Sequence, residues 1–320
     1  MNSTLQKTID DFCKYLDEYK QYSWLSSNIT DPICAYLFLL HHEEPNREIV
    51  DLCKKIIDEN SGVFSSFRGS VKPIYACILA TDSNPGDKMA LANAAYDALR
   101  NNFSASSALA LLAFVMAEIA KPSRYYDISL RTKILHQELN KVHPVLTDFN
   151  DVTFIGLLAM TSKKDENILI ETEAIYNAMK DEVSVFYKDV SQNLAFALTL
   201  CQGNPNIKIE NTLTLLHKLN ENRLRVTRDY TLVSLGILAN LKIPLDKLSE
   251  DIVDTYHYLK KRGNYGIFGY GKSGRLQHSL MIVAAHYMNA NIELLSAIIV
   301  NAIIQIQVQQ AAASSAASAA

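Results

Sequence analysis

Residues Ala108–Ala117, which read ALALLAFVMA, decide the fold class of this chain. The segment has no charged side chain, so apolar residues cover nearly every side of the helix that it predicts. A helix of this kind needs neighbours on all sides. It is also too short to cross a bilayer. The segment therefore predicts a short helix inside a helical core.

Segments of the same kind recur along the chain, and the first residues of successive segments are separated by 34 to 48 residues. No segment shows the strict alternation of apolar and polar residues that predicts a β-strand. A recurring unit of this length is typical of helical repeat proteins. The other segments are Ile33–Leu40, Ile74–Ala80, Phe154–Met160, Leu194–Leu200, Leu232–Ala239 and Leu280–Ala285.

Most of the apolar segments are followed by a turn and then by a more polar helix with a single apolar face. One such face carries Leu248, Ile252 and Tyr256, whose spacing of four residues places them on one side of a helix. The turns contain proline or glycine, as in Asn84-Pro85-Gly86. The pattern therefore predicts pairs of helices, each pair with one apolar member.

We predict an all-α protein of about seven stacked αα-hairpins, each of roughly 40 residues, arranged as a superhelix or an α/α toroid. An additional helix is expected at residues 4–22. The hairpins form a single domain over residues 1–310. Residues 311–320, which read AAASSAASAA, form a low-complexity Ala/Ser tail.

In this arrangement the apolar helices form an inner layer and all begin at the same end. The loops that lead into them therefore line up in space, and we expect a binding site on this loop face. The loops are 64–72, 102–107, 143–151, 187–192, 223–229 and 263–275.

The last of these loops begins a glycine-rich stretch, residues 263–287, that contains the literal phosphate-loop pattern ending in Lys272 and Ser273. A phosphate loop needs a strand before it, whereas the preceding residues have the pattern of an amphipathic helix. We therefore interpret the stretch as a helix C-cap at Gly263 followed by a compact turn. A weaker hypothesis remains open, in which Lys272 and Arg275 bind an anion at the start of the next helix.

The loop that ends at residue 151 places two carboxylates, Asp148 and Asp151, three residues apart. They could act as acid and base or hold a divalent cation. They are also suitable helix N-caps, and this is the interpretation that we favour. Asp189 and Arg228 each lie at the start of an apolar helix, where a cap or a local ion pair is the corresponding alternative to a site.

The spacing of histidine and cysteine predicts no metal site and no cofactor. His41 and His42 precede Pro45, where the helix ends, so we interpret them as a solvated helix C-terminus. His278 and His286 would lie about 12 Å apart along one helix, too far for one metal ion. The five cysteines show no CxxC spacing, which indicates reduced thiols. Cys34, Cys53 and Cys77 lie in apolar helical patterns, so we expect them to be packed in the core.

The net charge of −3 and the isoelectric point near 6.2 give no reason to expect binding to nucleic acid or to a membrane. Between Lys218 and Arg275, however, 11 Lys and Arg residues accompany 6 Asp and Glu residues, a balance that favours an anionic ligand. The N-terminus lacks the basic and apolar regions of a secretory signal. We expect a cytoplasmic protein.

Several segments of the chain resemble a bacterial family known as domain of unknown function 4003, which is typical of Gram-positive cytoplasmic proteins. The resemblance would span nearly the whole chain and implies an all-helical protein. It implies no established activity and assigns no catalytic residue. The similar residues are His143–Thr147 with Asp151 and Leu157–Ala159, Ser191–Leu194, Tyr230–Ala239, Gly266–Gly269 and the Ala/Ser-rich end.

Two functions remain open on the sequence alone. We favour a non-catalytic binding or scaffold module that uses the loop face, because helical repeats usually present surfaces and no complete catalytic set is visible. Its partner would be a protein or a small anionic ligand. The alternative is an α/α-toroid enzyme that acts on a small substrate bearing phosphate or carboxylate in a central pocket. Its charged groups would be Asp148, Asp151, Asp189, Arg228, Lys272, Arg275 and His278.

Overall fold

The structure is a computed structural model, and it describes residues 2–22, 30–62, 65–142, 151–182, 188–226, 231–266, 269–287 and 296–303. Within these ranges every regular element is a helix and no strand occurs. The prediction of an all-α fold is therefore confirmed. The expected tail at residues 311–320 lies outside the described ranges.

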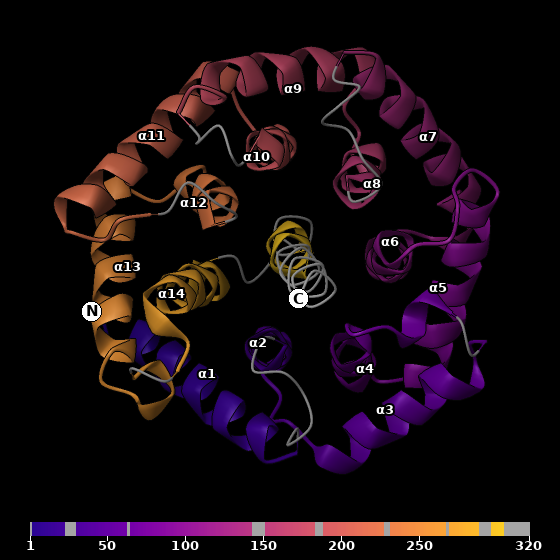
Figure 1. The fold of residues 1–320 in the computed structure, drawn as a ribbon, viewed down its shortest axis with the longest axis horizontal. Coiled ribbons are helices and arrows are strands. Elements are labelled where there is room, and N and C mark those ends of the chain that lie inside the picture. Colours follow the sequence, from indigo (N-terminus) through magenta and orange to yellow (C-terminus); the bar gives the residue numbers. More distant parts are fainter. Residues whose placement is uncertain are drawn as a thin grey trace, which may run out of the picture.

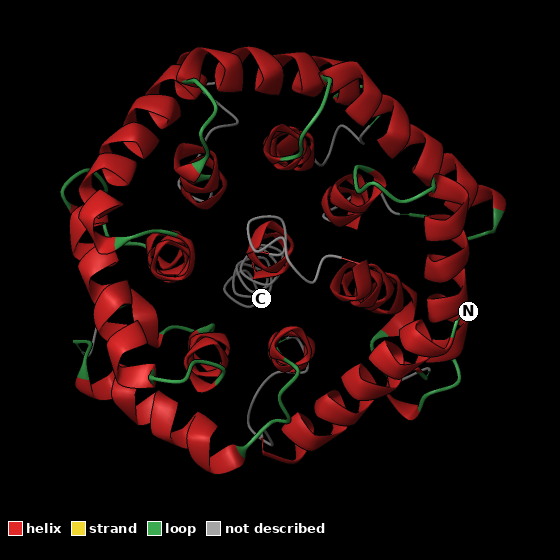
Figure 2. Ribbon diagram, turned by 180° about the vertical axis from the view of Figure 1, so that it is seen from behind, coloured by secondary structure: helices red, strands yellow, loops and turns green. Residues whose placement is uncertain are grey.

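The helices form two layers around a common centre (Figure 1). Figure 2 shows the same two layers from behind. The outer layer consists of α1 (Ser3–Tyr22), α3 (Arg47–Glu59), α5 (Pro85–Arg100), α7 (Tyr125–Val142), α9 (Asp165–Met179), α11 (Pro205–Glu221) and α13 (Leu245–Leu259). The inner layer consists of α2 (Asp31–His41), α4 (Lys72–Ala80), α6 (Ser107–Ile119), α8 (Val152–Met160), α10 (Lys188–Leu200), α12 (Thr231–Ala239) and α14 (Gly271–Tyr287). The 3-10 helices are η1 (Ser66–Arg68), η2 (Pro122–Arg124) and η4 (Gly263–Tyr265).

The two layers follow from the apolar patterns of the sequence. Every residue of the inner helix α12 is buried, because other helices surround it. The outer helix α3 buries only one face, which carries Val50, Cys53 and Ile57. Burying one large aliphatic or aromatic side chain stabilises the fold by about 1.5–3 kcal/mol. The inner helices therefore carry most of the hydrophobic stabilisation.

Each outer helix packs against the inner helix that follows it in the chain, as α1 does with α2 and α5 with α6. The sequence pattern suggested the opposite pairing, in which each apolar helix is followed by its polar partner. The helix expected as an addition at residues 4–22 is α1, the outer partner of α2. Local periodicity identifies the faces of a helix but not which neighbour each face meets.

The last hairpin lies beside the first. α14 contacts both α1 and α2. The Tyr258 hydroxyl of α13 donates a hydrogen bond to Asp10 of α1 at 2.7 Å, and Arg262 also donates to Asp10. Lys20 donates to Asn264 at 3.0 Å. These polar contacts join segments that are more than 240 residues apart in the sequence.

A helical segment at residues 296–303 lies at the centre, inside the inner layer (Figure 1). Ile298, Val300 and Ile303 of this segment are buried. Its Asn301 side chain donates a hydrogen bond to the Ser234 hydroxyl of α12 at 3.3 Å. The segment therefore packs on the inner layer from within.

The apolar helices do not form membrane spans. In the described part of the chain, none combines the length and the hydropathy needed to cross a bilayer. All five cysteines are buried free thiols, and for Cys34, Cys53 and Cys77 this burial was expected from the apolar helical patterns around them. The apolar surface of these helices is therefore used in packing between helices.

Glycine allows neighbouring inner helices to approach closely. A Cβ atom on Gly156 of α8 would lie 2.4 Å from Leu112 Cδ1 of α6. A Cβ atom on Gly236 of α12 would lie 2.6 Å from Leu194 Cδ1 of α10. Real Cβ atoms do not approach carbon atoms so closely, so a methyl group at either position would force the opposing leucine side chain to shift.

We expect Gly156→Ala to lower the free energy of unfolding by about 1–3 kcal/mol, because the added methyl group overpacks the contact with the fully buried Leu112. The loss outweighs the helix-propensity gain of about 1 kcal/mol. Urea denaturation followed by far-UV circular dichroism measures it. Gly86→Ala is the control, since a Cβ there would meet only Asn84 Oδ1, at 3.8 Å. A Gly156→Ala variant as stable as wild type would contradict this packing.

Candidate functional site

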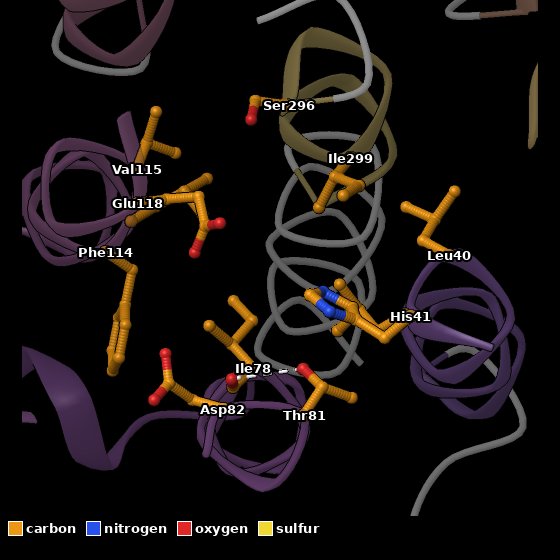
Figure 3. Close-up of a pocket in the computed structure, with 12 residues that line it drawn as sticks. Leu40, His41, Ile78, Thr81, Asp82, Phe114, Val115, Glu118, Ser296 and Ile299 are labelled. Carbon is orange, nitrogen blue, oxygen red and sulfur yellow. Dashed lines mark hydrogen bonds between the residues drawn. The ribbon is translucent and has the colours of Figure 1, made fainter. Parts of the chain in front are cut away.

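Three neighbouring inner helices, α2, α4 and α6, line a partly open cavity together with the central segment 296–303 (Figure 3). Most of the residues that line it lie in or just after the C-terminal halves of these helices, and its volume is about 290 Å³. Most of its wall is apolar and includes Leu40, Ile78, Phe114 and Ile299. Ligand sites are typically concave, mostly apolar and of about this size or larger. The cavity can therefore hold a small ligand.

Aromatic rings explain why there is space at this point of the inner layer. Tyr75 of α4 stacks on Phe114 of α6, with ring centroids 4.7 Å apart. Phe67 of η1 packs edge-on against Phe114 at 5.6 Å. These rings separate α4 from α6, whereas α6 and α8 meet at a glycine. Because α4 and α6 are held further apart than α6 and α8, room remains beside Phe114, which lines the cavity.

Polar side chains reach the cavity from all of its walls. The Glu118 carboxylate and the His41 ring lie on opposite sides in Figure 3. Ser296 is only 8% exposed, points into the cavity, and has no hydrogen-bond partner within the described residues. The hydroxyl is therefore available to hydrogen-bond with water or with a ligand in the cavity. The polar lining consists of His41, Thr81, Asp82, Glu118 and Ser296.

A buried lysine joins the two acidic residues of the cavity. Lys88 of α5 is 7% exposed, and its ammonium group donates to Glu118 Oε2. Lys88 Nζ also lies 3.5 Å from Asp82 Oδ2. Asp82 follows α4, and Glu118 lies in the last turn of α6. Lys88 therefore ties the ends of two inner helices together and compensates one of two negative charges.

The helices add to the negative potential of this region. The C-terminus of a helix carries a partial negative charge of roughly half an electron. Carboxylates such as Asp82 and Glu118 are unfavourable at this end of a helix, because their charges have the same sign as the dipole. With one ammonium for two carboxylates, the group formed by Asp82, Glu118 and Lys88 has a net negative charge.

His41 is the residue whose role the sequence indicated least well. The left-handed conformation of His42, with φ of 56°, ends α2 before Pro45, as expected. The His41 ring, however, lies at the cavity and is not only solvated (Figure 3). The described residues contain no cluster of three side chains that could hold a metal ion.

The acidic residues of the cavity were not among the predicted site residues. One signal was available: His41, Asp82 and Glu118 each follow or end one of three successive apolar segments. If the inner helices run in the same direction, their last residues meet at one end of the molecule. The predicted binding loops lie at the starts of these helices and not at their ends.

Part of the predicted site cannot be placed. Asp148 and Arg228 lie outside the described residues. Asp189 belongs to α10, but its side chain is also outside the described part. The structure therefore gives no geometry for these three side chains.

Asp151 does not act as the N-cap that we favoured. Its side chain makes no capping hydrogen bond to α8, because its backbone is already helical, with φ of −69° and ψ of −20°. A capping residue normally has an extended backbone. Asp151 is 5% exposed and accepts a hydrogen bond from Gln192 of α10 at 3.3 Å.

The three predicted residues of α14 point in different directions. Lys272 is exposed. Arg275 is buried, and its guanidinium lies 4.4 Å above the Tyr256 ring of the outer helix α13. His278 is buried, and its Nδ1 lies 2.7 Å from the Tyr265 hydroxyl. The structure shows no shared anion site made by these side chains.

The glycines of residues 263–287 serve the backbone of a turn. The helix α13 precedes this stretch, where a phosphate loop would need a strand, and the first three residues of the stretch form η4. A Cβ atom on Gly269 would lie 2.0 Å from Asn264 O, the atom that accepts the Tyr270 N–H at 3.0 Å. Gly271 has φ of 66°, which favours glycine. The predicted C-cap is wrong, since Lys260 caps α13 and Gly263 begins η4.

The chain belongs to a family described as protein of unknown function (DUF4003), whose sequence profile matches residues 14–311. This agrees with the resemblance found in the sequence. No curated protein and no solved structure shows significant similarity to the chain. The family carries no assigned activity.

Acid should destabilise the protein through His278. Burial, with a smaller contribution from Lys20, lowers the pKa of His278 from its ordinary 6.5 to about 3. Between these values the unfolded chain binds a proton that the folded chain does not, so stability falls as the pH decreases. From pH 8 to pH 5 we expect this residue to contribute a loss of about 2 kcal/mol.

Urea denaturation at both pH values measures this loss. In His278→Gln the difference between pH 8 and pH 5 should shrink, while His217→Gln, which changes an exposed histidine of α11, should retain it. An unchanged pH difference in His278→Gln would show that the buried imidazole is not responsible.

Proposed function

We propose that this protein is a non-catalytic binding module, built as an α/α toroid of hairpin repeats, that holds a small ligand between α2, α4, α6 and the central segment. The observation that carries the proposal is the apolar cavity of about 290 Å³ inside the ring. Core helices normally fill their interior at close to crystalline density. A space of this size among buried helices is therefore a candidate for an occupant.

The toroid is supported by the contacts between helices. Inner helices contact their neighbours along the ring, as α8 does with α10 and α10 with α12, and α14 contacts α2. Figure 1 shows the hairpins arranged around the central segment. In a toroid of this kind the inner wall and the central segment can enclose a ligand, whereas an open superhelix presents only a groove.

Binding is favoured over catalysis by the arrangement of the polar groups. A nucleophile or general base needs a partner at about 2.6–3.2 Å that orients or activates it. Ser296 and His41 make no hydrogen bond to each other or to another described residue. Asp82 and Glu118 both interact with the same lysine, Lys88. Such an arrangement can recognise a charged group.

The loop face remains a second candidate, because buried amides lie near the starts of two inner helices. Asn193 of α10 and Gln277 of α14 are 3% and 7% exposed, and no hydrogen bond reaches Asn193 Oδ1 or the Gln277 amide atoms. Leaving such groups unpaired costs about 1–3 kcal/mol. A ligand at this end, including the small anionic substrate of the enzyme hypothesis, would satisfy them.

We place the protein in the cytoplasm. All five cysteines are free, and burial raises the pKa of the Cys13 thiol to about 12, which keeps it protonated. Unpaired cysteines are typical of a reducing compartment. The location is therefore consistent with an intracellular ligand.

The cavity is tested with N-phenyl-1-naphthylamine, a neutral probe that fluoresces in apolar surroundings. We expect saturable binding with a stoichiometry of one. Ile78→Phe fills part of the cavity and should weaken binding by about tenfold or more, which corresponds to 1.4 kcal/mol.

Ile170→Phe is the matched control, because Ile170 is 63% exposed on α9, far along the chain from the cavity helices. It should leave the affinity unchanged. Circular dichroism and thermal melting confirm that each variant is folded. Equal binding by wild type and a folded Ile78→Phe variant would contradict the proposed site. If Gln277→Leu lost probe binding and Ile78→Phe kept it, the binding site would lie at the loop face instead.

A further inference from the structure

The chemistry of the cavity also indicates the class of ligand, an inference that rests on the proposed function. The apolar wall formed by Leu40, Ile78 and Phe114 suits a hydrocarbon or aromatic body. Asp82 and Glu118 lie near the ends of two of these helices and share Lys88, so a ligand that fills the cavity can place its polar group beside this pair. The sign of the charge in that region decides which polar group fits.

Negative charge dominates this region. Glu118 and Asp82 supply two carboxylates, and Lys88 is their only ammonium partner in the described residues. Glu118 uses only Oε2 for Lys88, so its second oxygen remains an acceptor within the described part of the chain. The helix C-termini add partial negative charge. An anionic group would be repelled here, and a neutral hydroxyl would gain little.

The remaining polar groups also suit a cation. Ser296 is 8% exposed as a residue, and its hydroxyl, which has no partner among the described residues, can accept a hydrogen bond. A histidine ring such as that of His41 can accept one through a ring nitrogen when it carries a single proton. An ammonium group has three N–H donors, and it needs acceptors for all of them when it is buried. Glu118, Ser296 and His41 surround the cavity from three different walls (Figure 3).

We propose that the ligand is a small amine with an apolar body, whose ammonium group is bound by Glu118 and Asp82. The apolar body packs against Leu40, Ile78 and Phe114. This reverses the sign of the ligand that the sequence suggested. The basic residues between Lys218 and Arg275 are not part of this cavity, which is lined by residues before Lys121 and by the central segment.

Competition against N-phenyl-1-naphthylamine with n-octylamine, n-octanol and octanoate tests the ligand class. The three competitors share a similar chain and differ in the charge of the head group. We expect n-octylamine to bind about tenfold or more tightly than n-octanol, and octanoate to bind most weakly. Equal affinities for the amine and the alcohol would overturn the inference.

Variants test which residues recognise the amine. Glu118→Gln and Asp82→Asn should each reduce the preference for the amine over the alcohol to about threefold or less. Glu138→Gln is the matched control, because Glu138 also pairs with a lysine, Lys141 at 2.6 Å, near the end of a helix. It should keep the full preference. An undiminished preference in both cavity variants would overturn the assignment of these carboxylates.

The two proposals fail in different ways. Binding in the cavity is shown when Ile78→Phe weakens the binding of both the probe and n-octanol. If they bind there but n-octylamine binds no more tightly than n-octanol, the cavity site stands and the proposed amine ligand is wrong. If neither the probe nor any competitor binds, the proposed function is wrong as well. Should Glu118→Gln melt at a much lower temperature, Asp82→Asn provides the same comparison.

Discussion

A helix without a polar face must be enclosed on every side, and the rest of this structure depends on that constraint. α8 and α12 have only buried side chains over most of their length, so no edge of the inner layer can be left open to water. The outer helices cover the outside, α14 closes against α1 and α2, and the central segment 296–303 covers the inside. Glycines at 156 and 236 let neighbouring inner helices approach closely. Where the aromatic cluster of Phe67, Tyr75 and Phe114 holds α4 and α6 apart, the enclosure leaves a cavity.

The sequence predicted the elements well because each layer has its own pattern. The segment expected at Phe154–Met160 is α8, which begins two residues earlier, at Val152. Asn84-Pro85 begins α5, with the Asn84 side chain accepting the Asp87 N–H and Pro85 in the first turn. The pairing of helices was not predictable, because an apolar helix meets neighbours on all sides and its own sequence does not rank them. The position of α1 beside α13 and α14 depends on contacts between the two ends of the chain.

The candidate site was predicted poorly for a related physical reason. A motif search favours groups that are close in sequence, such as Lys272, Arg275 and His278. In the helix, however, Lys272 points to solvent, Arg275 lies over Tyr256 and His278 meets Tyr265. The cavity combines a few residues from each of three hairpins with Ser296 and Ile299, which lie more than 170 residues after Glu118. Its volume is set by the separation of helices, which no local pattern records. Residues interpreted as ordinary helix ends therefore include the polar groups of the site.

A crystal structure of the protein under xenon pressure tests the central claim most directly. Xenon occupies apolar cavities without needing a specific polar contact, so it reports the space itself and not the chemistry of a chosen ligand. The account predicts a ring of outer and inner helices with xenon bound beside Ile78 and Phe114, between α4, α6 and the central segment. An inner layer in which side chains fill this space, with no xenon there, would contradict it.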